Sequence, residues 1–108
     1  MLEQTTKMNL LYDFYHPLLT EKQRLLVEMY YLDDWSLSEI AEHQGVTRQA
    51  VFESIKRAGK VLMELEQKLR LLEKHRQRQQ IAANLLKQLE PYAEAKAVAE
   101  PLIQKMIE

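Results

Sequence analysis

The fold of this chain is decided by residues 36–58, SLSEIAEHQGVTRQAVFESIKRA. Ser36 and Glu39 have the spacing of a capping box, in which the hydroxyl accepts a hydrogen bond from a first-turn amide and the carboxylate reaches back to the cap amide. A short helix is therefore predicted to begin after Ser36. Its inward face is predicted to consist of Leu37, Ile40 and Ala41. Gly45 follows this helix where a tight turn requires a positive φ, which glycine adopts without steric cost.

The residues after the glycine predict a second helix. Val46 is predicted to fill the corner, and Thr47 is a suitable cap for the helix that follows. The small Ala41 and the branched Val51 would let the two helices cross closely. Two helices joined by a short glycine turn are typical of a DNA-binding unit whose second helix enters the major groove. The alternative is a helical hairpin that only packs against the rest of the protein.

The second helix has a core-facing side and an outward side. The core-facing positions are Val51, Ser54, Ile55 and Ala58, and the outward positions are Arg48, Gln49, Phe52, Glu53, Lys56 and Arg57. In a major groove, Arg48 can bond guanine and Gln49 can bond adenine; Phe52 can contact a thymine methyl and Glu53 can accept from cytosine. Phosphate contacts are predicted for Thr47, Lys56, Arg57 and Lys60. The alternative for each is a solvent-facing side chain, and for Phe52 it is packing in the core or in an interface.

Two further helices are predicted before this pair. The first covers about residues 6–16 and is ended by Pro17. Thr20 and Gln23 form a second capping box, which opens a helix to about Leu32. The core spacing of that helix is given by Leu25, Leu26, Met29 and Tyr30. A polar break follows at residues 33–35, with Trp35 folding back onto the core.

Beyond the second helix, apolar residues follow the spacing of a coiled-coil seam. They are Val51, Ile55, Ala58, Leu62, Leu65, Leu69 and Leu72. A seam this narrow needs another helix, either from the C-terminal segment or from a second copy of the chain, and we expect both together in a homodimer. The predicted dimerisation residues are Leu62, Leu65, Leu69 and Leu72. The pattern fails near residue 75, and residues 74–80 are predicted to be an exposed helix or a bend.

The C-terminal part is predicted to be helical as well. An apolar stripe over residues 81–89 is stopped by Pro91, and Pro101 is predicted to open a last turn. We therefore predict a helix-turn-helix domain over residues 1–60 and a helical extension and dimerisation segment over residues 61–108, which together form one continuous structural unit.

Composition limits the classes of function. The chain has 108 residues, a net charge of −1 and no cysteine, with only two glycines and three prolines. Residues 1–46 carry three basic and eight acidic side chains, whereas residues 47–80 carry nine basic and four acidic ones, as a polyanion partner would favour. No apolar run is long enough to span a membrane, so a soluble, cytoplasmic protein is expected. No catalytic, metal-binding or cofactor motif is recognisable, and we expect neither enzyme activity nor a cofactor.

The sequence resembles the small bacterial YlxM family of helix-turn-helix proteins. The resemblance rests on LYDFYHPLLTEKQ (11–23), YYLDDWSLSEIAE (30–42) and TRQAVFESIKR (47–57). The core is also similar to the promoter-reading fourth region of primary-type sigma factors. The resemblance implies an all-α fold in which a helix-turn-helix without a wing, like sigma region 4, is followed by a long heptad-patterned helix and C-terminal helices. It also implies a regulatory role in the signal recognition particle pathway.

Three hypotheses for function follow. The first is a dimeric regulator that binds nucleic acid through residues 36–57, with DNA favoured over RNA. The second is an accessory factor of the signal recognition particle whose basic residues 56–78 contact the particle's RNA or GTPase. The third is a purely structural module in which the heptad seam binds another helix.

Overall fold

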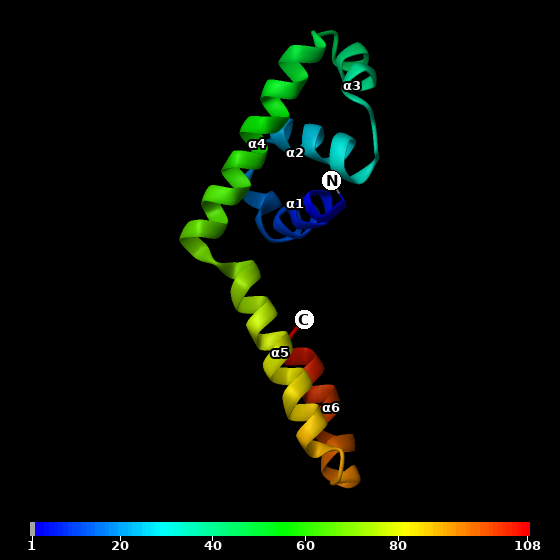
Figure 1. Cartoon of the computed structure of the whole chain (residues 1–108), viewed down its shortest axis with the longest axis vertical. Coiled ribbons are helices and arrows are strands. Elements are labelled where there is room, and N and C mark those ends of the chain that lie inside the picture. The colour runs from blue at the N-terminus through cyan, green and yellow to red at the C-terminus, as the bar shows by residue number, and fades with distance from the viewer. Residues whose placement is uncertain (1) are drawn as a thin grey trace. The chain divides into compact units, whose positions relative to one another are not determined.

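The computed structural model describes the backbone of residues 2–108 and the side chains from residue 6 onward (Figure 1). The elements in chain order are α1 (Leu2–Tyr15), the short 3-10 helix η1 (His16–Leu18), α2 (Glu21–Val27), the π-helical turn η2 (Glu28–Leu32), α3 (Leu37–Gln44), α4 (Arg48–Leu69), α5 (Leu71–Leu89) and α6 (Ala93–Met106). The described residues contain no strand, so the predicted all-α class is confirmed.

The chain divides into two compact units, Met1–Arg70 and Leu71–Glu108. The boundary that we predicted at residue 60 falls inside α4. The helix runs past Gly59 without a break and ends only at Leu69. The two units are described separately below.

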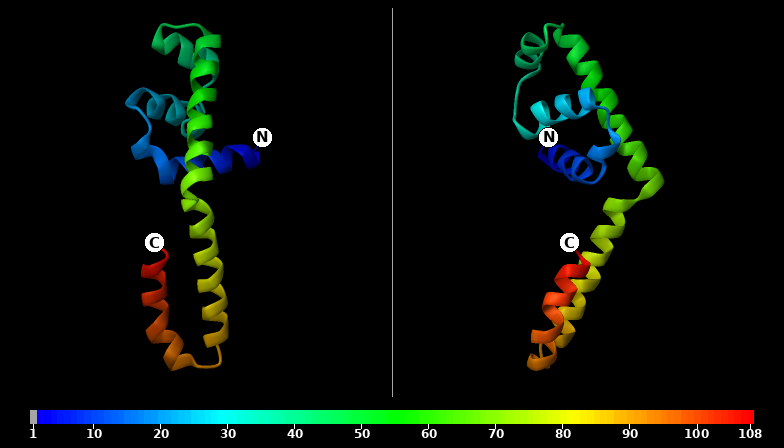
Figure 2. Two further views of the ribbon diagram at one scale, coloured as in Figure 1. Left: turned by 90° about the vertical axis from the view of Figure 1, so that its left-hand side faces the viewer. Right: turned by 180° about the vertical axis from the view of Figure 1, so that it is seen from behind.

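In the first unit, α1, α2 and α3 pack against the long helix α4. Figures 1 and 2 show these three helices on the same side of α4. The largest fully buried side chains of this unit are Leu11, Tyr15, Val27, Ile40, Val51 and Leu62. The Tyr15 hydroxyl donates a hydrogen bond of 2.5 Å to Glu66 Oε1 and so joins α1 to the C-terminal half of α4. The position of α4 is thus fixed along most of its length.

Both predicted capping boxes are present. The Ser36 hydroxyl accepts from the Glu39 amide and the Glu39 carboxylate accepts from the Ser36 amide, each at 3.0 Å. Thr20 and Gln23 make the equivalent pair at 3.0 and 3.2 Å. These reciprocal bonds satisfy amides that a helix start otherwise leaves without a partner. The starts of α2 and α3 are therefore set by local sequence.

The turn between α3 and α4 is a glycine-terminated Schellman motif. Gly45 has a φ of 68°, the Val46 amide donates to the Ala41 carbonyl at 3.0 Å, and the Gly45 amide donates to the Glu42 carbonyl at 3.3 Å. Our prediction that the Val46 side chain fills the corner is wrong, because it is 48% exposed. In this motif the backbone amide of Val46 closes the turn, and its side chain points to solvent.

We expect Gly45→Val to lower the free energy of unfolding by about 1–3 kcal/mol, because a β-branched residue is strained at positive φ. No neighbouring atom lies within 4 Å of a Cβ built at this position, so the effect isolates backbone strain from packing. Urea denaturation provides the measurement. Gly45→Asn is the matched control, since asparagine tolerates this conformation. Equal decreases in the free energy of unfolding for the two variants would contradict the conclusion that residue 45 needs a positive φ.

The predicted seam is not one continuous helix. Arg70 has a φ of 56° and its amide donates to the Glu66 carbonyl at 2.8 Å, which ends α4 before Leu72. Val51, Ile55, Ala58 and Leu62 are buried inside the first unit. These positions are covered by helices of the same chain, so the prediction that Leu62 faces a second copy is wrong. Leu65 is half-buried, Leu69 is 42% exposed, and Leu72 is buried on α5.

The helix predicted from Thr20 to Leu32 changes geometry midway. After Val27 the chain widens into η2, where the Asp33 amide reaches back five residues to the Glu28 carbonyl at 2.9 Å. Leu25 is 42% exposed, contrary to our prediction that it lies in the core, and Val27 is buried in its place. Trp35 packs against the core cluster around Met29 and Ile40, as predicted.

Tyr12 is a buried phenol that donates a hydrogen bond to the Glu28 carboxylate and so ties α1 to η2. Burial and this hydrogen bond to an acidic group raise the pKa of Tyr12 to about 12 from an ordinary value of 10.0. Because the pKa of Tyr12 is higher in the folded state than in the unfolded state, Tyr12 contributes to the free energy of unfolding at pH values below 10. This contribution is lost as the pH rises from 10 toward the folded-state pKa of about 12.

We therefore expect the free energy of unfolding to fall by about 2–3 kcal/mol between pH 10 and pH 12 because of Tyr12. Tyr12→Phe should remove this part of the alkaline fall, as measured by urea denaturation across that range. Tyr92→Phe is the control, because Tyr92 is exposed on the second unit. An unchanged alkaline fall in Tyr12→Phe would contradict the role of this phenol.

The second unit is a hairpin of two helices. Figure 2 shows α5 and α6 side by side and antiparallel. Ala82 of α5 and Ile103 of α6 are buried. Residues 74–80 are helical and largely exposed, which is one of the two predicted alternatives. Pro101 was predicted to open a last turn, but it lies inside α6, which runs unbroken from Ala93 to Met106.

Candidate nucleic-acid interface

The outward face of α4 carries the side chains that we predicted to contact nucleic acid. Seven of the eight predicted residues are exposed and Glu53 is half-buried; the exposed set is Thr47, Arg48, Gln49, Phe52, Lys56, Arg57 and Lys60. The opposite face carries the buried Val51, Ile55 and Ala58. The structure therefore brings the eight residues together on one helix and its cap, on the side that the core does not use.

The start of α4 is fixed by its cap. Thr47 Oγ1 accepts a hydrogen bond from the Ala50 amide at 3.1 Å, as predicted. The same oxygen retains its own proton, with which it can donate to a phosphate. The cap fixes the start of α4 and therefore the directions in which the Arg48 and Gln49 side chains project, because both residues lie in the first turn.

Two side-chain hydrogen bonds hold polar groups along the exposed face. Gln49 Nε2 donates to Glu53 Oε1 at 3.0 Å, and Arg57 donates to the Ser54 hydroxyl at 3.3 Å. The first bond orients Gln49 and gives the Glu53 carboxylate a partner on its own helix. The donor is a neutral amide, so the carboxylate keeps its negative charge on this face.

A hollow of about 480 Å³ adjoins the base-reading positions. It is lined by Leu37 of α3 and by Arg48, Gln49 and Phe52 of α4. Leu37 packs against the core cluster, as predicted, but it is only half-buried and its remaining surface lines this hollow. The first helix of the pair therefore contributes an apolar contact surface beside the polar reading groups, which the capping pattern alone did not indicate.

Sequence reasoning placed Tyr30 in the core and did not assign Tyr30 or Tyr31 to the candidate site, although both also pack against the core cluster. Both side chains line a second hollow beside Phe52 and Lys56, and their rings meet edge to face with centroids 5.0 Å apart. Burial raises the pKa of Tyr31, with a smaller contribution from Tyr30. Their placement follows from the wide turn of η2, which shifts the side chains relative to a regular helix. An apolar periodicity of 3.6 residues does not reveal such a turn.

The Glu39 carboxylate belongs to the scaffold of the pair. The Ser36 amide and hydroxyl lower the pKa of Glu39 by hydrogen bonding its charged form. Metal-ligand side chains do not gather in groups of three or more within the described residues. In the same part of the chain, no helix combines the length and apolar character needed to cross a membrane.

These features define an all-α helix-turn-helix protein: two capped helices, a glycine turn with positive φ, and a second helix with one buried and one exposed polar face. Comparison with known proteins agrees with this class. The chain belongs to the UPF0122 family, described as "helix-turn-helix protein, YlxM / p13 like", whose family model matches residues 2–101.

Curated relatives come from several bacilli. The chain is 56% identical over 87 residues to a UPF0122 protein of Shouchella clausii strain KSM-K16, a match that covers 81% of this chain and 80% of the relative. It is 57% identical over 85 residues to a UPF0122 protein of Bacillus cereus strain AH187, covering 79% of this chain and 77% of the relative. A UPF0122 protein of Bacillus thuringiensis subsp. konkukian strain 97-27 matches to the same extent.

Proposed function

We propose that this protein is a cytoplasmic, non-catalytic regulator that binds duplex DNA through α3 and α4. The most direct evidence for this is the exposed polar face at the start of α4. The opposite face of the helix is held in the core by the buried Val51 and Ile55. A helix held in this way presents its first turns to the major groove, which is wide enough to admit it.

Each exposed residue has a role in this proposal. Arg48 and Gln49 lie in the first turn of α4 and read bases, because their side chains each offer two hydrogen-bonding groups. Phe52, one turn later, offers an apolar edge to a thymine methyl.

Three basic side chains, Lys56, Arg57 and Lys60, follow and neutralise phosphates. Thr47 adds a phosphate hydrogen bond at the helix cap, and Glu53 can accept from cytosine.

The direct test is the affinity of the full chain for a labelled duplex at increasing salt, measured by fluorescence anisotropy. Phosphate contacts release counterions, so the logarithm of the association constant should fall linearly with the logarithm of salt concentration. Three to five phosphate contacts predict a slope of about −3 to −4.5 for B-DNA. Absence of binding at low salt would refute the proposal.

We further propose that the protein acts as a homodimer. Leu62 and Leu72 are buried within the chain, so of the predicted dimerisation residues only Leu65 and Leu69 retain an accessible surface. Two copies would place two reading helices on adjacent half-sites of a palindrome. Sedimentation equilibrium should give twice the chain mass at micromolar concentrations, and a monomer would contradict this part alone.

A second candidate function is supported by a separate observation. Exposed basic side chains continue on α5 at Lys74, Arg76 and Arg78, outside the helix-turn-helix. We propose them as the contact surface if the protein is an accessory factor of the signal recognition particle. Co-purification of the particle with an Arg48→Ala, Gln49→Ala variant would support this candidate. Lack of any association with the particle's RNA or GTPase would dismiss it.

A further inference from the structure

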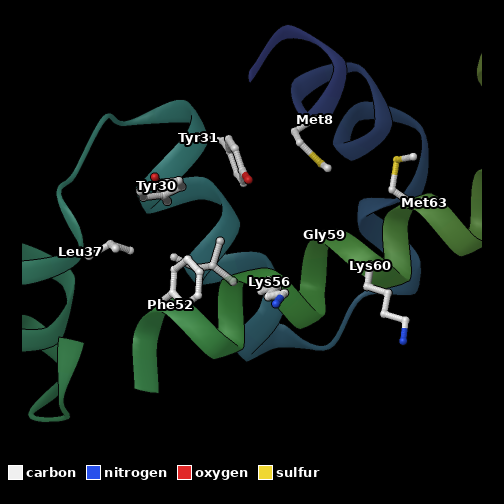
Figure 3. Close-up of a pocket in the computed structure, with 10 residues that line it drawn as sticks. Met8, Tyr30, Tyr31, Leu37, Phe52, Lys56, Gly59, Lys60 and Met63 are labelled. Atoms are coloured by element: carbon white, nitrogen blue, oxygen red, sulfur yellow. The ribbon is translucent and has the colours of Figure 1, made fainter. Parts of the chain in front are cut away.

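A groove on the first unit has the size and chemistry of a ligand site. It has a volume of about 540 Å³, within the range of about 300–1,000 Å³ that is typical of small-molecule sites. Its lining comes from α1, η2, α3 and α4, and Figure 3 shows Met8 and Tyr31 facing α4 across it. All of these elements belong to one compact unit, so the groove is part of a single folded body.

The walls of the groove are mostly apolar and adaptable, and the tyrosine hydroxyls and lysine ammonium groups add polar atoms to them. Met8 and Met63 provide flexible thioethers, while Tyr30, Tyr31 and Phe52 provide ring surfaces. Phe52 is 44% exposed, although an aromatic ring is stabilised by burial. Thioethers and aromatic rings together suit an elongated apolar chain that has no hydrogen-bonding groups along its length.

The charged groups of the groove are all of one sign. Lys56 and Lys60 line it from α4, and the lining residues that the structure describes include no carboxylate. Figure 3 shows both lysines on α4, with Lys60 extending away from Met8 and Tyr31, and both side chains are exposed. An ammonium group at the edge of an apolar surface attracts an anion, while the lysine stem can cover the apolar part of the ligand.

We propose that this groove binds a free apolar carboxylate, with its chain against Met8, Tyr31 and Met63 and its carboxylate beside Lys56. Charge complementarity selects an anion, and the length of wall along α4, from Phe52 to Met63, is about 16 Å at 1.5 Å per residue, which suits a medium acyl chain. The ligand would bind where the DNA-reading face and the groove overlap.

This overlap gives the ligand a regulatory consequence, which rests on the proposed DNA binding. Phe52, Lys56 and Lys60 belong both to the groove and to the predicted reading face. A carboxylate beside Lys56 would remove a phosphate contact and add a negative charge facing the DNA. Ligand binding and DNA binding therefore oppose each other, and each lowers the affinity for the other by the same factor.

The probe is dodecanoate, titrated below its micelle concentration into the full chain and followed by calorimetry. We expect saturable binding of one dodecanoate per chain and no saturable binding of dodecyltrimethylammonium, which has the same chain and the opposite charge. Met63→Glu should weaken dodecanoate binding about tenfold or more, because it places a carboxylate in the groove. Met106→Glu, at an exposed methionine of α6, is the matched control and should bind like the parent.

Lys56→Gln with Lys60→Gln should weaken dodecanoate binding about tenfold, whereas Lys74→Gln with Lys87→Gln on α5 should not. All four lysines are exposed, so these variants keep the fold, as thermal unfolding would verify. Equal binding of the cationic probe, or equal affinity in Met63→Glu and Met106→Glu, would overturn the site.

The competition is tested by adding dodecanoate to the protein–DNA complex. A lower affinity for DNA in the presence of dodecanoate is expected, and an unchanged affinity for DNA would overturn the regulatory part. If dodecanoate binds but the protein binds no DNA, the proposed function fails and the ligand site stands. If DNA binds and dodecanoate does not, the ligand site alone fails.

Discussion

We expect Arg48→Ala combined with Gln49→Ala to abolish the sequence preference of DNA binding. Both side chains are exposed in the first turn of α4, and each bidentate base contact contributes about 1–3 kcal/mol of discrimination. The lysines and Arg57 remain, so weak binding to any sequence should persist. The measurement compares the affinities of parent and variant for a selected duplex and for a scrambled one.

The matched control for this variant is Arg76→Ala with Gln77→Ala. This is the same pair of residue types, exposed on α5 outside the helix-turn-helix. It removes one positive charge, as the test variant does, and should leave the preference intact. Equal loss of preference in both variants would show that charge rather than base reading carries the effect.

The second large effect is on stability. We expect Leu62→Ala to lower the free energy of unfolding by about 2–5 kcal/mol, because the side chain is fully buried and its removal leaves a cavity. Leu69→Ala lies one heptad later at a position that is 42% exposed, and should cost about 0.5 kcal/mol or less. Urea denaturation of both variants gives the comparison.

This pair separates two roles for the heptad pattern. If Leu62 packs inside the chain, the decrease in the free energy of unfolding caused by Leu62→Ala is independent of protein concentration. If the seam instead joined two copies, the two variants would have comparable effects, and both would increase on dilution. That second outcome would contradict the packing of α4 against α1 and α2.

The elements that sequence predicted best are those with local causes. The caps at Thr20, Ser36 and Thr47 and the turn at Gly45 each depend on a few neighbouring residues, and all four occur as predicted. The buried and exposed faces of α4 followed from its 3.6-residue period. The grouping of Arg48, Gln49 and Lys56 on one exposed face was predictable for the same reason.

The elements that sequence missed depend on tertiary structure. Arg70 adopts a left-handed conformation that its residue type does not favour, so the end of α4 had no local signal. The apolar residues between 51 and 62 have the same spacing whether they face their own chain or a second copy. Only the fold shows that α1, α2 and α3 cover them. Proline is typical of the first turn of a helix, yet Pro101 lies in the interior of α6.

The groove residues were hidden for a related reason. Tyr30 and Tyr31 reach Phe52 through the wide turn of η2, and Met8 comes from α1, which is distant in sequence. A pattern within one helix cannot indicate such a surface, because it is assembled from four elements.

The most direct test of DNA reading by α4 is an in vitro selection of binding sites from random duplexes with the unmodified chain. We expect an enriched motif that contains guanine and adenine at adjacent positions, as Arg48 and Gln49 would select. Selection that yields no enriched motif after repeated rounds would contradict direct reading of DNA by α4.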